Sequence, residues 1–256
     1  MKKFCILATQ RSGSTWLMDS IQRSVHSRGI FAELFLDQPA QSPDPWSEPQ
    51  GNLEPPVRYY DWRKTSGAFL LIAPRLYLAF LELYAQKEPY FGFKIMCNQL
   101  VKKPWLASLL RQGGYSVLHL KRKNLLDVYI SVQNLQMAQP HLRLDDLKTA
   151  RDYDPIRLDP VVVYRTIRGL IRREKMAESI IKLFGISMET VEYNRLADGD
   201  KNEIERLDRF IGQPIDLFSQ QGLQKLSKKN TPQKITNYEE VISYLKKKGL
   251  DTSYYT

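Results

Sequence analysis

The chain has 256 residues, of which 38 are lysine or arginine and 28 are aspartate or glutamate, so its formal net charge is +10. Hydrophobic residues make up 43% and charged residues 26%, and these proportions exclude a disordered, collagen-like or small disulfide-stapled protein. No apolar run approaches the roughly 20 residues that cross a bilayer, so we expect a soluble single domain with a sizeable core. Cys5 and Cys97 lie in apolar, strand-like runs, which favours buried thiols in a reducing, cytoplasmic compartment.

The positive charge is unevenly distributed along the chain. Residues 101–175 carry 15 basic and 7 acidic side chains, whereas residues 176–221 carry 5 basic and 9 acidic ones. Such a distribution fits a nucleic-acid surface, a site for a small anionic ligand or a solvated basic face. Composition alone leaves these three interpretations open.

Hydrophobic spacing predicts strands and helices that alternate along the chain. Strands are predicted at 3–9, 30–36, 90–97, 115–120 and 188–193, and helices at 16–29, 71–87, 104–113, 125–137, 160–184, 203–211 and 237–249. Asp159 is the predicted N-cap of the long helix, and Thr236 with Glu239 is predicted to form a capping box before the last one. The fold class is therefore α/β: one domain with a mostly parallel sheet of about five strands, flanked by helices.

Two long connections interrupt this alternation. Residues 37–66 contain six prolines interleaved with aromatic residues, and residues 138–158 are polar. Loops of this length in compact domains are usually lids, binding loops or disordered segments. We expect both to lie on the substrate side of the protein.

The first chemical signal follows the first predicted strand, where the sequence reads QRSGSTW from Gln10 to Trp16. At a strand-to-helix turn, free N–H groups and the helix dipole point at one spot, and Gly13 allows a ligand to approach the backbone. The guanidinium group of Arg11 adds a positive charge and a forked set of N–H donors, which suit tetrahedral oxyanions. The alternative is an ordinary N-capped helix. A triphosphate-binding P-loop is disfavoured because Ser12-Gly13-Ser14 stands where Gly-Lys is required.

This segment resembles the 5′-phosphosulfate loop, [KR]-S-G-[ST]-[ST], of sulfotransferases that use 3′-phosphoadenosine 5′-phosphosulfate (PAPS). The resemblance implies a P-loop nucleotide-kinase-like fold, with PAPS bound as co-substrate and no metal. The donor-binding residues that it implies here are Arg11, Ser12, Gly13, Ser14 and Thr15.

A second strand-to-helix segment, from Val117 to Ser131, resembles the 3′-phosphate motif of the same family. Lys123 and Ser131 stand eight positions apart, as in the family, but many relatives carry arginine where Lys123 stands. Arg122 is adjacent, so either cation can be the phosphate ligand. The alternative is a basic strand end followed by a solvated helix start.

Other segments resemble the bacterial nodulation-factor and trehalose-type sulfotransferases. They are YFGFKIM at 90–96, VEYNRL at 191–196, SKKN at 227–230 and ITNYEEV at 235–241. The resemblance places Trp16 and Tyr193 against adenine, with core packing as the alternative. It also places Lys228 and Lys229 over the nucleotide, where a solvated charge pair is the alternative.

The general base is assigned from the same resemblance. Cytosolic relatives use a histidine two residues after the lysine of the central strand, but here Lys94 is followed at that spacing by Met96. The bacterial group instead has a glutamate in a G-x-x-x-E-x-F segment, which residues 29–35 match with Glu33. Neighbouring apolar side chains are expected to desolvate this carboxylate and raise its pKa. A strand-edge glutamate paired with a cation is the alternative.

We therefore expect a sulfotransferase that moves the sulfuryl group of PAPS to a hydroxyl of a small acceptor, such as a sugar or a natural product. Glu33 is the expected base, and Arg11 and Lys94 are expected to neutralise the developing charge. The alternative for Lys94 is that it stands at the end of a strand and only extends its ammonium group to solvent, without a role in charge neutralisation. His26, His119 and His141 are expected to be structural or solvated. An ATP-dependent kinase on a related fold and, less favoured, a nucleic-acid-binding module are the alternative functions.

Overall fold

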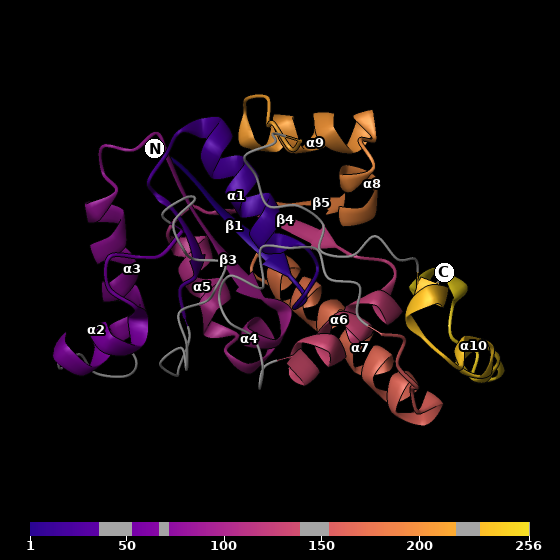
Figure 1. Ribbon diagram of the computed structural model, residues 1–256. Coiled ribbons are helices and arrows are strands. Elements are labelled where there is room, and N and C mark those ends of the chain that lie inside the picture. Colours follow the sequence, from indigo (N-terminus) through magenta and orange to yellow (C-terminus); the bar gives the residue numbers. More distant parts are fainter. Residues whose placement is uncertain (36–52, 67–71, 139–153, 219–230, 256) are drawn as a thin grey trace.

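The computed structural model describes residues 1–35, 53–66, 72–138, 154–218 and 231–255. Within these residues, five parallel strands form one sheet in the order β2-β3-β1-β4-β5 (Figure 1). The strands are β1 (Lys2–Ala8), β2 (Ile30–Glu33), β3 (Tyr90–Met96), β4 (Ser116–Lys121) and β5 (Met188–Glu192). The predicted α/β class and parallel sheet are therefore confirmed.

Helices connect and flank the strands. The α-helices are α1 (Ser14–Val25), α2 (Tyr59–Ser66), α3 (Ala73–Tyr84), α4 (Cys97–Lys102), α5 (Trp105–Gln112), α6 (Leu125–Ala138), α7 (Pro160–Leu183), α8 (Tyr193–Ala197), α9 (Lys201–Ile211) and α10 (Tyr238–Lys247). Short 3₁₀ turns lie at Thr231–Lys234 and Thr252–Tyr254. Among these described elements, no helix combines the length and apolar character needed to span a membrane.

β1 lies at the centre of the sheet because almost its whole length is apolar. Residues from Phe4 to Ala8 are at most 1% exposed, as expected for a strand covered on both faces. In the register of the sheet, Ala8 lies opposite Met96 of β3 and Leu120 of β4. The carboxyl ends of these three strands therefore meet at one edge, where an open α/β sheet binds its ligands.

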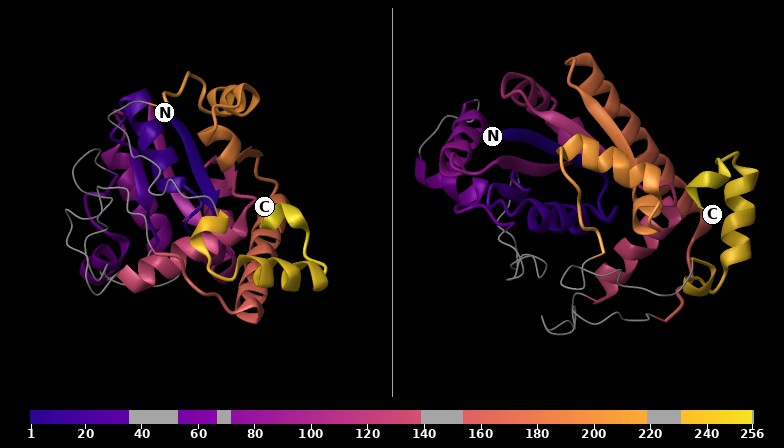
Figure 2. Two further views of the ribbon diagram at one scale, coloured as in Figure 1. Left: turned by 45° about the vertical axis from the view of Figure 1, so that its right-hand side comes forward. Right: turned by 90° about the horizontal axis from the view of Figure 1, so that it is seen from above.

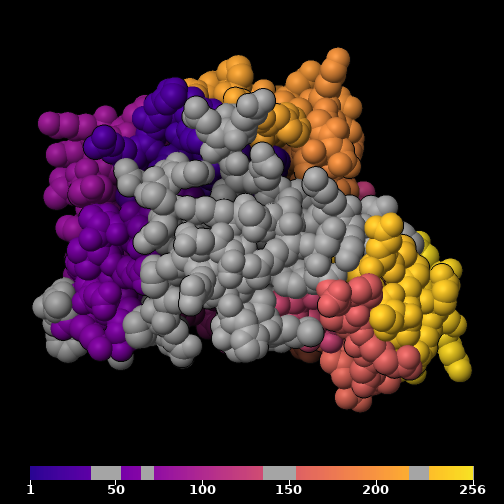
Figure 3. All heavy atoms as spheres, viewed as in Figure 1, coloured from indigo at the N-terminus to yellow at the C-terminus, as the bar shows by residue number. Residues whose placement is uncertain are grey.

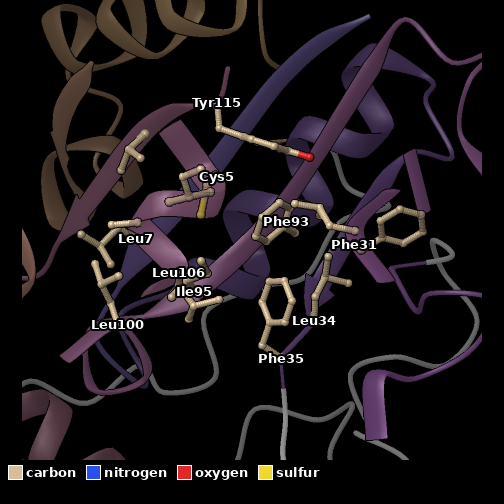
Figure 4. Close-up of a cluster of buried hydrophobic side chains, with 14 of the residues drawn as sticks. Cys5, Leu7, Phe31, Leu34, Phe35, Phe93, Ile95, Leu100, Leu106 and Tyr115 are labelled. Carbon is tan, nitrogen blue, oxygen red and sulfur yellow. The ribbon is translucent and has the colours of Figure 1, made fainter. Parts of the chain in front are cut away.

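The two faces of the sheet are covered by different helices. On one face, strand residues such as Phe31 and Phe93 lie in a cluster with Tyr115, Leu100 of α4 and Leu106 of α5 (Figure 4). Residues of α3 and α7 complete this cluster. On the other face, Phe4, Ile6 and their neighbours pack with residues of α1, α8 and α9. Cys5 and Cys97 are buried free thiols, as predicted, and burial raises the pKa of both.

A third apolar cluster joins α6, α7 and α10 and includes the fully buried Tyr255. It holds the C-terminal segment at the opposite end of the molecule from α2 and α3 (Figures 1 and 2). In the space-filling view, this segment lies beside the beginning of α7 (Figure 3). Ile156 and Ile235 form an isolated parallel bridge there.

The prediction of an irregular loop over residues 37–66 is wrong for its last part, because residues 59–66 form the helix α2. Two of the aromatic residues that suggested a binding loop, Tyr59 and Trp62, pack against α3 instead. The rings of Tyr59 and Trp62 lie 5.2 and 5.5 Å from that of Tyr77, and Tyr77 Oη donates to the carbonyl of Val57 at 2.7 Å. Residues 36–52, and 139–153 of the second predicted loop, lie outside the described part of the chain.

Several predicted boundaries also change. The capping box of Thr236 with Glu239 is wrong, because α10 has Asn237 at its N-cap. The side chain of Asn237 binds the backbone N–H and carbonyl of Leu158, so it connects two segments instead of capping the helix. α1 ends at Val25, well before Gly29. In contrast, Asp159 caps α7 as predicted, accepting hydrogen bonds from the N–H groups of residues 161 and 162.

Candidate functional site

The turn between β1 and α1 presents hydrogen-bond donors at the carboxyl edge of the sheet. Arg11 (φ 60°) and Gly13 (φ 86°) adopt left-handed conformations that turn the chain from the strand into the helix. Ser12 is fully buried, and its hydroxyl donates to the carbonyl of Thr9 at 2.7 Å. The helix begins at Ser14, and the N-cap Gly13 has no side chain with which to bind its first N–H groups. These groups and the helix dipole can therefore bind an anion.

A second turn, between β4 and α6, lies directly beside the first. Arg11 Nε donates to Ser131 Oγ at 3.1 Å, and Arg122 Nη1 donates to the carbonyl of Arg11 at 3.0 Å. The two turns meet because they follow adjacent parallel strands. The structure thus brings together residues of the two predicted anion sites, which are 120 positions apart in the sequence.

The carboxylate of Asp127 connects the second turn to the C-terminal segment. It accepts hydrogen bonds from Arg122 Nη2 at 3.0 Å, Lys234 Nζ at 3.1 Å and Thr231 Oγ1 at 2.9 Å. Asn124 accepts a hydrogen bond from the backbone N–H of Asp127 at 2.9 Å and donates to Thr231 Oγ1 at 3.3 Å. Burial alone would raise the pKa of Asp127, but Lys234 and Arg122 outweigh it and lower the pKa below its ordinary value.

The predicted base and the central-strand lysine are neighbours. Glu33 ends β2 and lies opposite Lys94 of β3. Lys94 Nζ is 3.9 Å from Glu33 Oε1 and donates to Thr15 Oγ1, at the start of α1, at 2.9 Å. The side chain of Lys94 is 5% exposed and that of Glu33 is 23% exposed. A buried ammonium group therefore lies between the first turn and an accessible carboxylate.

Two aromatic residues lie beside the first turn. The ring of Tyr193 is so close to Gly13 that a Cβ at that position would lie 2.0 Å from a ring carbon. Trp16 meets this ring edge-on with 5.7 Å between the centroids, and the guanidinium of Arg122 is 5.0 Å from the Tyr193 centroid. Burial raises the pKa of Tyr193 against the opposing effect of Arg122. Both aromatic residues also pack against the core around α1.

The two cations of the second motif have different surroundings. Arg122 is 12% exposed and is held by Asp127, by the carbonyl of Arg11 and by the ring of Tyr193. Its Nε is buried and has no hydrogen-bond partner among the described residues. Lys123 is 58% exposed and pairs with Glu192 at 2.8 Å. Lys228 and Lys229 lie outside the described residues.

Four residues of the site were not predicted from the sequence. Gln99 belongs to α4, a helix that the hydrophobic pattern did not indicate; its Nε2 donates to Glu33 Oε2 at 3.1 Å. Thr231 and Lys234 reach the site only through tertiary folding. Asp127, by contrast, could have been found from the sequence. It stands three residues after Asn124, and this spacing is typical of an N-cap residue followed by a residue of the first helical turn.

A separate charged cluster lies between β4 and α7. His119 is completely buried, with Nδ1 3.3 Å from Glu178 Oε1 and Nε2 3.8 Å from Glu174 Oε1. These three residues are spaced closely enough to hold a metal ion. However, Lys121 also contacts both carboxylates, and its ammonium group supplies positive charge at that place. The cluster therefore fits an ion-pair network that fastens α7 to the sheet.

Comparison with known proteins finds a likeness in structure but none in sequence. No model of a known protein family matches the chain, and no curated protein matches it in sequence. In structure, the chain is similar to the sulfotransferase domain from the curacin biosynthetic pathway. The TM-score is 0.45 and the sequence identity 8%, over 98% of this chain and 92% of that domain. At this level of similarity we infer no activity from the match and derive the function from the site itself.

Proposed function

We propose that the protein transfers the sulfuryl group of PAPS to a hydroxyl of a small acceptor, such as a sugar or a natural product. The observation that carries this proposal is the hydrogen bond between Arg11 and Ser131. It joins the turn that resembles a 5′-phosphosulfate loop to the turn that resembles a 3′-phosphate site. PAPS carries anionic groups at both ends, and two adjacent anion sites at one sheet edge suit such a donor.

The chemistry of the surrounding residues also fits PAPS. Cationic, hydroxyl and backbone N–H donors surround the first turn, and Arg122 Nε is a buried donor without a hydrogen-bond partner among the described residues. For the 3′-phosphate we propose Lys123 as the cationic ligand, because its side chain is more than half exposed and therefore accessible to a ligand. Arg122 then positions the backbone of Arg11. Trp16 and Tyr193 would contact the adenine.

Catalysis is assigned to three side chains. PAPS supplies an activated sulfuryl group, which the acceptor oxygen attacks in line as the bond to the phosphate oxygen breaks. Glu33 accepts the proton of the attacking hydroxyl, and its 23% exposure leaves it accessible to an acceptor. Lys94 and Arg11 stabilise the negative charge on the transferring group and the leaving phosphate. The residue two positions after Lys94 is Met96, so a carboxylate base of the bacterial type replaces the histidine of cytosolic relatives.

The decisive experiment incubates the protein with PAPS and a panel of alcohols and sugars, and detects the mass gain of one sulfuryl group. A thermal-shift titration with the product 3′,5′-adenosine bisphosphate (PAP) tests nucleotide binding independently. Stabilisation by PAP together with a sulfated product supports the proposal. Failure to bind PAP, combined with phosphorylation of an acceptor from Mg²⁺-ATP, would establish the kinase alternative instead. Steeply salt-dependent RNA binding without PAP binding would favour the nucleic-acid alternative.

A further inference from the structure

Gln99, at the start of α4, has a side-chain amide whose two ends are occupied by different partners. Its Oε1 accepts a hydrogen bond from the backbone N–H of Met96 at 2.9 Å, and its Nε2 donates to Glu33 Oε2 at 3.1 Å. A backbone N–H can only donate, so the oxygen of the amide must face Met96. The NH₂ group must therefore face Glu33, and the direction of this hydrogen bond is determined by the fold.

The two oxygens of Glu33 consequently have different surroundings. Oε2 is bound by Gln99, whereas Oε1 faces the ammonium group of Lys94 at 3.9 Å. Lys94 is itself directed to Thr15 Oγ1. Lys103, the C-cap residue of α4, donates to the carbonyl of Phe35, two residues after Glu33, at 3.4 Å. Glu33 is thus held from β3 by a cation and from α4 by an amide.

We propose that Gln99 is a positioning residue for Glu33, an inference that rests on the proposed function with Glu33 as the base. Its amide holds Oε2 and stabilises the ionised carboxylate, because hydrogen bonds to the charged form of a group favour that form. This hydrogen bond fixes the orientation of the carboxylate that receives the proton of the acceptor hydroxyl. Gln99 itself touches neither the donor nor the acceptor in this assignment.

Gln99→Glu is the sharpest test, because it separates the two hydrogen bonds of Gln99. A glutamate keeps an acceptor for the N–H of Met96, as in an ordinary capping box, but places a second carboxyl against Glu33. Two carboxyls in contact share a proton, which raises the apparent pKa of the pair. The acidic limb of the kcat profile should therefore move up by about one pH unit or more. The KM for PAPS should stay the same.

Gln99→Met removes both hydrogen bonds without adding charge, and so it remains informative if the glutamate variant fails to fold. It should lower kcat about 10-fold or more through loss of orientation, again with the KM for PAPS unchanged. Gln112→Glu provides the matched control. Gln112 is exposed on α5 and donates to Ser108 of its own helix, so the same change in charge there should leave the pH profile as in the wild type.

A measurement without turnover separates this inference from the proposed function. In protein labelled with ¹³C at the glutamate carboxyls, the signal that disappears in Glu33→Gln identifies Glu33. Its titration midpoint should rise in both Gln99 variants and not in Gln112→Glu. An unchanged midpoint would overturn the role of Gln99 even if the wild type transfers sulfuryl groups. A raised midpoint in an enzyme that transfers none would instead refute only the proposed function.

Discussion

Asp127 provides the most demanding test of the site, because its carboxylate connects Arg122, which also binds the carbonyl of Arg11, to the C-terminal segment. Its side chain is 14% exposed, and those of Arg122 and Lys234 are 12% and 14% exposed. At about 3 Å and an effective dielectric constant of about 20, each cation contributes about 5 kcal/mol of gross attraction. Desolvation cancels much of this, but removing one partner of a buried ion pair typically costs about 3 to 5 kcal/mol.

Asp127→Asn keeps the size of the side chain and removes its charge, leaving two nearly buried cations without their carboxylate. We expect the free energy of unfolding to fall by about 3 kcal/mol. This corresponds to a shift of roughly 1 M in the urea midpoint for a slope of about 3 kcal/mol/M. PAP binding should weaken at the same time, because Arg122 then loses the partner that directs it to the backbone of Arg11.

The control for this variant is Asp200→Asn. Asp200 pairs with Arg195 at the surface and caps α9, and asparagine is an equally good N-cap. Its urea midpoint and its PAP affinity, the latter measured by isothermal titration calorimetry, should therefore stay near those of the wild type. If Asp127→Asn unfolds at the same urea concentration and binds PAP as tightly as Asp200→Asn does, the proposed coupling through Asp127 is refuted.

Three further predictions follow from the geometry. Gly13→Ala should lower the melting temperature more than Gly114→Ala does. Both glycines have positive φ, but an added Cβ would meet the ring of Tyr193 only at Gly13, whereas it would have open space at Gly114; equal losses would show that Tyr193 does not limit this position. Glu33→Gln should bind PAP normally while kcat falls about 10²- to 10⁴-fold, and an unchanged kcat would exclude Glu33 as the base. The imidazole of His119, with Nδ1 3.3 Å from Glu178 Oε1, lowers the pKa of Glu178 from 4.5 to about 2, opposed by burial and aided by Lys121. The stabilising effect of Glu178 is therefore complete above about pH 4.5 and is lost as the pH falls towards 2. Acid unfolding followed by circular dichroism should accordingly begin at higher pH in His119→Gln, and an unchanged acid transition would contradict this assignment.

The centre of the sheet was predictable from the sequence because β1 and β4 are short apolar runs, each followed by a turn signal and helical spacing. The runs containing Phe4 and Val117 led to β1 and β4 with boundaries within one or two residues of those observed. The short helices were not predictable in this way. α2 and α4 have eight and six residues, too few for a hydrophobic period to appear, and their stability comes from tertiary packing.

The contacts that organise the site depend on sequence separations that no local pattern encodes. Resemblance to the two motifs of the sulfotransferase family identified Arg11 and Ser131 as candidates for two anion sites, but their hydrogen bond requires β1 and β4 to be neighbours in the sheet. The bond between Gln99 and Glu33 likewise requires β2 to lie beside β3, with α4 beginning directly at the end of β3.

The order of the strands also explains why the proposed base and the proposed phosphate sites occupy different parts of the site. β1 is central, with β3 on one side and β4 on the other. The turn after β1 can therefore reach Ser131, which follows β4, while Thr15 at the start of α1 accepts a hydrogen bond from Lys94 of β3. Glu33 lies beyond Lys94 on β2. A donor bound across the β1 and β4 turns would then present its transferable group towards Lys94 and Glu33, which is the geometry that in-line transfer to an acceptor beside β2 requires.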